Sequence, residues 1–256
     1  DVCDNDLISK YLKKNDIIIP LAAIVGAPAC NLFPERSKEI NLNSYLHLIK
    51  NISDDQILIF PTTNSGYGIG EKNKFCDENT PLNPISTYGK YKVQVEKRIL
   101  EKNNSISLRL ATVFGASPRM RIDLLVNDFV FKAVSDKYII LFEEHFKRNY
   151  IHIKDVVRTF SFAIENFEKM KNNAYNVGLE DANLSKKELA EKIKEYVKDL
   201  YIHSASIGTD PDKRDYIVTN KKLMNLGWKP IHDLDYGIKE LILYYKFLNT
   251  SNCTNI

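Results

Sequence analysis

Three short apolar runs, separated by helix-patterned segments, are the feature that most constrains how this chain can fold. The first run covers 17–24, and similar runs follow at 56–61 and 107–113. Short runs of this kind are typical of strands that are buried on both faces of a parallel sheet. Their alternation with helical patterns predicts an α/β fold with helices on both faces of that sheet. The expected strands lie near 16–23, 56–61, 107–113 and 173–177.

The helical patterns fall between and after these runs, at 4–15, 35–51, 84–103, 121–135, 153–170, 185–197 and 235–248. Before the helix at 185–197, Ser185 is suited to cap the helix N-terminus. The sequence contains no internal repeat, low-complexity segment or Pro/Gly/Ser-rich linker. If the chain forms two domains, we therefore expect them to be interleaved along the sequence.

Composition disfavours several classes of protein. The 36 Lys and Arg residues are spread among 33 acidic residues, with no dense basic run, which argues against nucleic-acid binding. No apolar run reaches the roughly 18 residues of a membrane span, and no secretory signal pattern is present. The scattered cysteines predict neither a disulfide framework nor a metal site, and they fit a reducing cytoplasm. These are Cys3, Cys30, Cys76 and Cys253.

Tyr88 and Lys92 lie four residues apart at the start of the predicted 84–103 helix. This spacing places both side chains on one helical face. A nearby ammonium group favours a phenolate and lowers the pKa of a tyrosine from about 10 towards neutral pH. The two residues are therefore a candidate proton shuttle for a substrate hydroxyl, although solvated helix faces often carry such a pair without any function.

A hydroxyl-rich turn follows the strand predicted at 56–61. It contains Thr63 and Ser65 and ends in Gly66-Tyr67-Gly68, and Thr63 lies 25 residues before Tyr88. Ligands of open parallel sheets bind beyond the carboxyl ends of the strands, so hydroxyl groups at this position are well placed. Simple turn chemistry is the alternative explanation, because turns use the same residue types.

Together, the strand end and the Tyr-x-x-x-Lys helix resemble the NAD-dependent nucleotide-sugar epimerase/dehydratase family, the extended short-chain dehydrogenases/reductases. The resemblance implies a Rossmann-like, doubly wound parallel sheet with bound NAD and a smaller C-terminal substrate-binding region. It implies that Tyr88 is the general acid/base, that Lys92 is its electrostatic partner and the anchor of the nicotinamide ribose, and that Thr63 bonds the reacting hydroxyl. The expected NAD-binding part comprises 1–116 and 150–180, and the expected nucleotide-sugar part comprises 117–149 and 181–256.

Further segments extend the resemblance to the C-terminus. The segment 109–115 is similar to the family's Arg-x-x-Asn-x-x-Gly strand end, with Thr112 in place of the asparagine. Segments 148–155 and 212–230 are similar to two other family signatures, which implies that Arg148 and Arg214 contact the nucleotide diphosphate. The residues implied to shape the sugar pocket are Asn64, Ser65 and Thr112. In contrast, His152 and Asp155 are expected to be structural, as a packed histidine and a helix N-cap.

Cofactor contacts are implied near the N-terminus, at Asp1, Val2, Leu21, Ala22, Ala23 and Asn41. The match at 21–23 departs from the family at Pro20, where a histidine is usual. The Gly-x-x-Gly-x-x-Gly turn that seats a pyrophosphate does not occur in this sequence. Because the family places that turn roughly 60 residues before the position of Asp1, we expect an N-terminal segment to be missing from this sequence. Loss of the cofactor site is the alternative.

The residues after Thr63 bear on the type of reaction. Sugar dehydratases of the family have an Asp-Glu pair there, whereas Asn64 and Ser65 can orient a substrate but cannot exchange protons near neutral pH. Dehydration is therefore disfavoured, and hydride transfer at sugar carbon 4 through a 4-keto sugar is expected, in a 4-epimerase or a 4-dehydrogenase. The runs at 63–71 and 118–129 are most similar to bacterial enzymes that oxidise carbon 4 of GDP-manno-heptose, and the expected substrate is a GDP- or UDP-linked sugar.

Two further expectations concern catalysis and assembly. A non-catalytic nucleotide-sugar binder is the alternative function. The missing glycine-rich turn supports it, and the set of Thr63, Tyr88 and Lys92 opposes it.

The family resemblance implies a homodimer in which the helices 35–51 and 84–103 pair with those of a second copy. A stripe at helical spacing would contribute to that interface or, alternatively, pack on the chain's own sheet. It consists of Leu42, Tyr45, Leu46 and Ile49.

Overall fold

The computed structural model describes residues 1–208 and 213–247, and it divides into two compact units. The first unit consists of Asp1–Ile69, Cys76–Leu110 and Phe160–Asn176. The second consists of Gly70–Phe75, Ala111–Thr159 and Val177–Ile256. Each unit is therefore assembled from segments that are distant in the sequence. The assignment of one part to the cofactor and the other to the sugar stays a prediction.

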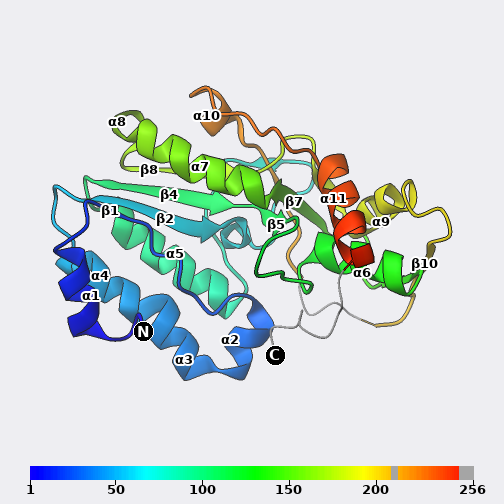
Figure 1. Cartoon of the computed structure of the whole chain (residues 1–256), viewed down its shortest axis with the longest axis horizontal. Helices are drawn as coiled ribbons and strands as arrows, with labels where there is room; N and C mark the ends of the chain where they lie inside the picture. Colours follow the sequence, from blue (N-terminus) through cyan, green and yellow to red (C-terminus); the bar gives the residue numbers. More distant parts are fainter. Residues whose placement is uncertain (209–212, 248–256) are drawn as a thin grey trace. The chain divides into compact units, whose positions relative to one another are not determined.

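A four-stranded sheet forms the centre of the first unit, in the order β1-β2-β4-β8 (Figure 1). The strands are β1 (Ile17–Ile18), β2 (Ile57–Thr63), β4 (Ser105–Leu110) and β8 (Asn173–Val177). β2 pairs in parallel with both β1 and β4, and Thr62 and Thr63 lie opposite Arg109 and Leu110. The predicted α/β class and the parallel pairing of the first two apolar runs are confirmed.

The first strand is much shorter than predicted. Only Ile17 and Ile18 pair with β2, whereas 19–25 has no regular structure. Pro20 has no N–H to donate to a strand ladder, which gives the physical reason for the early end. The hydroxyl of Tyr45 instead lies 3.1 Å from the carbonyl oxygen of Pro20 and 2.5 Å from that of Ala22.

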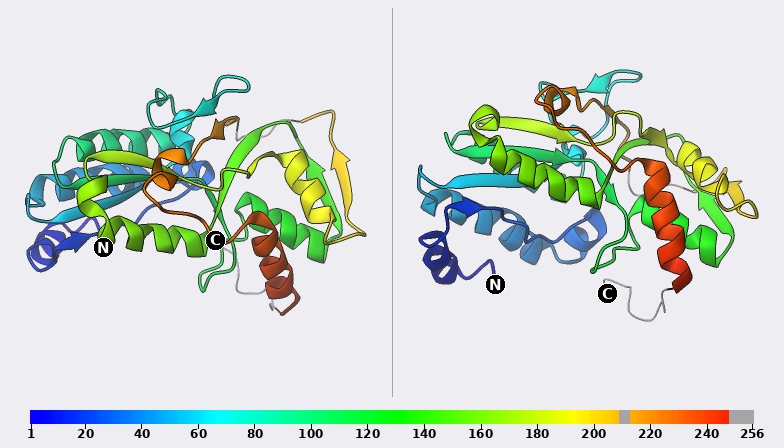
Figure 2. Two further views of the ribbon diagram at one scale, coloured as in Figure 1. Left: turned by 90° about the horizontal axis from the view of Figure 1, so that it is seen from above. Right: turned by 45° about the horizontal axis from the view of Figure 1, so that its top comes forward.

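Helices cover both faces of this sheet (Figure 1, Figure 2). Those of the first unit are α1 (Asn5–Leu12), α2 (Ala27–Leu32), α3 (Pro34–Lys38), α4 (Ser44–Asn51), α5 (Thr87–Leu100) and α8 (Phe167–Met170). α4 and α5 lie on one face, and residues 160–170 lie on the other. The helix predicted at 35–51 is interrupted by η1, a π-helical turn at Glu39–Asn43.

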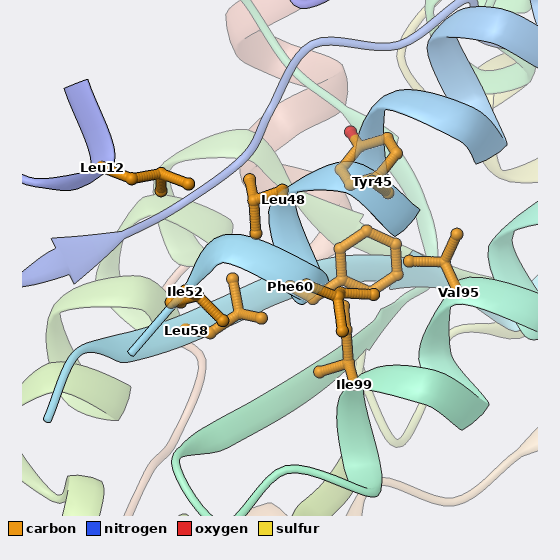
Figure 3. Packing of buried hydrophobic residues seen from close by; sticks show 9 residues of the cluster. Leu12, Tyr45, Leu48, Ile52, Leu58, Phe60, Val95 and Ile99 are labelled. Atoms are coloured by element: carbon orange, nitrogen blue, oxygen red, sulfur yellow. The ribbon is translucent and has the colours of Figure 1, made fainter. Parts of the chain in front are cut away.

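The hydrophobic core of the first unit lies between the sheet and helices α4 and α5 (Figure 3). It consists of Leu12, Tyr45, Leu48, Ile49, Ile52, Leu58, Phe60, Val95 and Ile99. Two residues of the stripe proposed for a dimer, Tyr45 and Ile49, belong to this core, and Leu42 packs against it. Only Leu46 is exposed, so the stripe packs on the chain's own sheet. The homodimer itself stays a prediction.

The second unit contains a three-stranded sheet in the order β5-β7-β9 and a two-stranded parallel sheet of β6 and β10. Its strands are β5 (Thr112–Phe114), β6 (Tyr138–Leu141), β7 (Lys147–His152), β9 (Asn183–Ser185), β10 (Tyr201–Ser204) and β11 (Ile217–Val218); β3 (Phe75–Cys76) lies at the boundary of the units. Its helices are α6 (Leu125–Ser135), α7 (Ile153–Glu165, continuing into the first unit), α9 (Lys186–Lys194), α10 (Lys221–Met224) and α11 (Leu234–Phe247). α6 contacts both α9 and α11 (Figure 2).

The predicted cap of α9 is confirmed, because the Ser185 hydroxyl accepts a hydrogen bond from the backbone of Glu188. His152 is fully buried, and its Nε2 lies 2.9 Å from a carboxylate oxygen of Glu240.

The predicted N-cap role of Asp155 is wrong. Asp155 lies inside the first turn of α7, and its carboxylate accepts the N–H groups of Ile231 and His232. At the start of the helix it is His152 Nδ1 that accepts a backbone N–H, from Lys154.

None of the helices in the described residues has the length and apolar composition of a membrane span.

Candidate active site

Helix α5 runs antiparallel to β2 and brings its N-terminal turn to the carboxyl end of that strand. Near the helix C-terminus, Ile99 packs in the core with Leu58 at the start of β2. Two turns earlier in the helix, Lys92 Nζ donates a 3.0 Å hydrogen bond to the carbonyl oxygen of Pro61 near the strand end. Tyr88 precedes Lys92 by four residues and is half-buried. The two side chains therefore project from the same face of α5, as predicted.

Lys92 carries an ammonium group into an apolar environment. Only 2% of its surface is exposed, and Nζ lies 4.5 Å from the ring centre of Phe60 and 5.1 Å from that of Tyr45. Burial lowers the pKa of Lys92 to about 7, since removing a cation from water disfavours the charged form. Across the described residues, no carboxylate forms an ion pair with Lys92. Burial and electrostatic repulsion from Tyr88 together raise the pKa of Tyr45.

Thr63 ends β2 and caps a short 3-10 turn, η2 (Asn64–Tyr67). Its Oγ1 accepts the N–H of Ser65 at 3.1 Å and donates to the Ser65 hydroxyl at 2.9 Å. The two hydroxyls predicted to contact the sugar are thus hydrogen-bonded to each other at the strand end. Thr63 is half-buried and Ser65 is buried.

Gly66 and Gly68 allow η2 and the residue after it to pack closely against α5 and the segment that leads into it. A Cβ atom at Gly68, where φ is +68°, would lie 2.1 Å from the carbonyl oxygen of Asn83. A Cβ atom at Gly66 would meet Val93 of α5 at 3.1 Å. This packing brings the Thr63–Ser65 turn to the N-terminal turn of α5. Thr63, Ser65, Tyr88 and Lys92 therefore gather at one end of the sheet in the first unit.

Asn64 has an unusual environment in this turn. Its side chain is 1% exposed, and neither its Oδ1 nor its Nδ2 has a hydrogen-bond partner among the described residues. Leaving a buried amide unpaired costs about 1–3 kcal/mol for each group. Native proteins contain few such groups, and this amide lies at the strand end beside Thr63 and Ser65.

The cofactor contacts expected near the N-terminus have different environments. Asp1 forms a 2.6 Å ion pair with Arg36, and Val2 is half-buried. Leu21 is 66% exposed, Ala22 is exposed and Ala23 is half-buried. Asn41 is fully buried and holds the following segment, because it accepts the N–H of Ile24 and donates to its carbonyl oxygen.

The donors of the first unit fit a bound dinucleotide. Lys92 uses one of its three N–H donors on Pro61, which leaves donors for ribose hydroxyl oxygens. The exposed residues Leu21 and Ala22 lie in an irregular segment that Tyr45 and Asn41 hold by hydrogen bonds. Tyr88 and Lys92 would hold the nicotinamide side of NAD, and residues 21–23 would contact the backbone of the cofactor.

The residues predicted to bind substrate phosphates lie in the second unit with Thr112. Thr112 is half-buried on β5 opposite Tyr150 of β7. Arg148 is 3% exposed on β7, with its guanidinium 5.6 Å from the ring centre of Tyr216, and Arg214 is half-buried. The Asp215 carboxylate accepts the N–H of Lys147 at 2.8 Å. This bond ties the chain beside Arg214 to the chain beside Arg148, so the two arginines come from adjoining segments.

The sequence analysis did not predict a buried polar network in the first unit, beside Thr63 and Lys92. It is formed by Tyr67, Glu96, Arg109 and Asn176. The contact of Tyr45 with Lys92 was not predicted either. Glu96 follows Lys92 by four residues, so its place on the same face of α5 was available as a signal. The role of Tyr45 had no such signal, because its partners lie 23 and 25 residues earlier in an irregular segment.

The chain is similar in sequence to known proteins. A family model described as "NAD dependent epimerase/dehydratase family" matches residues 1–178. A UDP-glucose 4-epimerase from Lactobacillus helveticus is 28% identical over 260 residues, covering 91% of this chain and 78% of that protein. A CDP-paratose 2-epimerase from Salmonella typhi is 25% identical over 268 residues, covering 92% and 78%.

Solved structures show the same fold. A UDP-glucose 4-epimerase from Thermotoga maritima with UDP-glucose has a TM-score of 0.83 and 23% sequence identity, covering 96% of this chain and 82% of that chain. A UDP-glucose 4-epimerase from Thermus thermophilus in complex with NAD has a TM-score of 0.82 and 20% identity. The Rossmann-type α/β fold expected from the sequence is confirmed.

Proposed function

Because the chain belongs to the NAD-dependent epimerase/dehydratase family, we propose that it transfers hydride at carbon 4 of a nucleotide-diphosphate sugar through a 4-keto sugar. The observation that carries the proposal is the convergence of Tyr88 and Lys92 of α5 with Thr63 at the end of β2. The names of the relatives support this substrate class, because they refer to UDP-glucose and CDP-paratose. The family description agrees with the expected cofactor, NAD.

Each residue of the first unit has a defined task in this proposal. Tyr88 in its phenolate form accepts the proton of the carbon-4 hydroxyl. In this proposal, ionisation of Tyr88 and protonation of Lys92 favour each other, because opposite charges attract. Thr63 orients the hydroxyl that loses its proton. Bound NAD supplies the hydride acceptor.

The proposal also assigns the substrate contacts to individual side chains. The guanidinium groups of Arg148 and Arg214 suit the charge and the fork geometry of a diphosphate. Asn64, Ser65 and Thr112 contact the sugar. Asn64 and Ser65 carry no group that exchanges protons near neutral pH, which favours hydride transfer without dehydration. Whether the 4-keto sugar is reduced again or released distinguishes a 4-epimerase from a 4-dehydrogenase.

The test uses the protein with NAD and a panel of UDP-, GDP-, dTDP- and CDP-sugars, followed by nicotinamide absorbance and product stereochemistry. We expect Tyr88→Phe to reduce turnover by about 100-fold or more while binding of the sugar persists, because the change removes the proton acceptor and little volume. An unchanged rate for Tyr88→Phe with a substrate that the parent turns over would contradict the mechanism. Tight sugar binding with no turnover by the parent would favour a non-catalytic binding protein instead.

A further inference from the structure

A buried ion pair joins the helix of Tyr88 and Lys92 to the sheet. Arg109 of β4 and Glu96 of α5 are 6% and 3% exposed. Arg109 donates from its second terminal nitrogen to Glu96 Oε1 at 2.7 Å and from Nε to Glu96 Oε2 at 3.2 Å, which is a fork contact. Glu96 Oε2 also accepts the hydroxyl of Ser107, two residues before Arg109 on β4, at 2.6 Å. One carboxylate of α5 is therefore held by two side chains of one strand.

The other terminal nitrogen of Arg109 reaches the turn at the end of β2. It donates to the hydroxyl of Tyr67 at 3.0 Å and to the carbonyl oxygen of Glu78 at 3.2 Å. Tyr67 is the last residue of η2, and its hydroxyl also lies 2.7 Å from Asn176 Oδ1 on β8. Arg109 itself lies opposite Thr62 in the sheet, one residue before the position of Thr63. A single guanidinium thus links α5, η2 and β4.

Stability alone does not explain this buried charged network. Burying two charges carries a desolvation penalty that often cancels their attraction, and apolar replacements of buried ion pairs can be as stable. Val95 and Ile99 of α5 pack on the sheet through apolar contacts, and Lys92 donates a hydrogen bond to the carbonyl oxygen of Pro61 on β2. Apolar packing tolerates small sliding and rotation of a helix, whereas a bidentate fork has narrow geometric limits.

We propose that Glu96 and Arg109, together with Tyr67, are positioning residues that fix the depth and rotation of α5 on the sheet and so hold Lys92 and Tyr88 in register with Thr63. Glu96 lies one helical turn from Lys92, and Lys92 lies one turn from Tyr88. A small rotation of α5 at Glu96 would therefore displace both side chains from the strand end. The inference rests on the proposed function only for its effect on turnover.

The test replaces the pair by apolar residues of similar length, in Glu96→Met/Arg109→Met, and follows Lys92 without any ligand. In protein labelled with 13Cε-lysine, the Lys92 signal is assigned by its loss in Lys92→Arg and titrated against pH. In the parent, Lys92 faces Tyr45 of α4 and Phe60 and Pro61 of β2, and Tyr88 precedes it by four residues on its own helix. We expect the double variant to fold and the pKa of Lys92 to rise by about one unit or more, because a loosened helix admits water.

A matched control is the exposed pair of Arg98 and Glu101 at the end of the same helix. Its double replacement by Met should leave the titration of Lys92 unchanged. With NAD and a confirmed substrate, Glu96→Met/Arg109→Met should lower kcat by at least about tenfold and change KM by less than about threefold, as expected for loss of positioning alone. The Lys92 titration decides the inference even if no substrate is found.

A folded double variant with the parent's Lys92 titration would overturn the proposal. If the double variant does not fold, Arg109→Lys keeps the charge and loses the fork, and it should raise the pKa of Lys92 in the same direction. A folded Arg109→Lys with an unchanged titration would also overturn it. Failure of both variants to fold would assign the network to folding and not to positioning.

Discussion

Lys92 combines a buried position with a charge, so its effect on stability depends on pH. A lysine in an unfolded chain titrates near 10.4, whereas burial lowers the pKa of Lys92 to about 7. Between these values the unfolded chain binds more protons than the folded chain, so the free energy of unfolding rises with pH above about 7. Below pH 7 the buried cation carries its full cost, which the Pro61 carbonyl and the two aromatic rings offset in part.

We therefore predict that Lys92→Met stabilises the ligand-free protein more at pH 6 than at pH 9. The expected difference between the two pH values is about 2–3 kcal/mol, from about 1.4 kcal/mol for each pKa unit. Urea denaturation of parent and variant at both pH values measures it. Lys90→Met, on an exposed position of the same helix, is the control and should show no such difference. Equal stabilisation by Lys92→Met at both pH values would contradict the prediction.

Asn64 allows a second prediction at the scale of one residue. Its buried amide has no hydrogen-bond partner among the described residues. Replacing Asn64 by leucine, whose side chain has a similar branched shape, removes this uncompensated polar group. We expect Asn64→Leu to raise the free energy of unfolding by about 1–2 kcal/mol and to weaken sugar binding. Asn64→Asp should have the opposite effect on stability, because it buries a charge. Calorimetric titration and urea denaturation test both parts, and a destabilised Asn64→Leu would count against the account.

Sequence reasoning worked best for residues whose role follows from local spacing. The helical spacing of Tyr88 and Lys92 and the strand-end position of Thr63 needed no tertiary information, and the structure brings them together. Their chemical roles stay predictions. The orphaned amide of Asn64 and the contact between Tyr45 and Lys92 depend on packing between distant segments, which local spacing does not specify.

At the scale of elements, the approach of η2 to α5 depends on a glycine with no room for a side chain. A Cβ atom at Gly68 would lie 2.1 Å from a carbonyl oxygen and would stand on a left-handed backbone. Gly227 also has a positive φ, at +97°, but a Cβ atom there meets nothing within 4 Å. The two positions therefore separate the cost of backbone strain from the cost of a clash.

We predict that Gly227→Ala destabilises the protein by about 1 kcal/mol, from backbone strain alone. Gly68→Ala should cost about 3 kcal/mol or more and should also reduce turnover, because Asn83 leads into the helix of Tyr88 and must move. Chemical denaturation of both variants, with the activity assay, checks the difference. Equal losses of stability, or a Gly68→Ala protein with the parent's activity, would show that the close approach is unimportant.

Two elements differ from their sequence-based predictions, and each difference has an identifiable physical cause. The apolar run at 17–24 continues past Pro20, but strand pairing stops at Ile18, since hydrogen bonding and not hydropathy defines a strand. The helix at 35–51 has a continuous helical pattern and yet contains the π turn η1, within which Asn41 bonds to Ile24. Such local irregularities are specified by tertiary hydrogen bonds, which a periodicity does not encode.

At the scale of the whole molecule, the fold class and the family were predictable, whereas the short strands of the second unit were harder to predict. The alternation of apolar runs and helices is a property of the whole chain, and it survives errors in any one element. In contrast, β5, β7 and β9 of the second unit are short and combine parallel with antiparallel pairing, so they give little periodic signal.

The central claim is that hydride leaves carbon 4 of a nucleotide-diphosphate sugar. The most direct measurement uses a UDP- or GDP-sugar that carries deuterium at carbon 4, incubated with the protein and NAD, with the label located by mass spectrometry. We predict that deuterium appears in the reduced nicotinamide, or returns to carbon 4 of the inverted sugar, and that Tyr88→Phe slows this transfer by about 100-fold. A substrate that is converted elsewhere while carbon 4 keeps both its deuterium and its configuration, with no deuterium in the nicotinamide, would contradict the account.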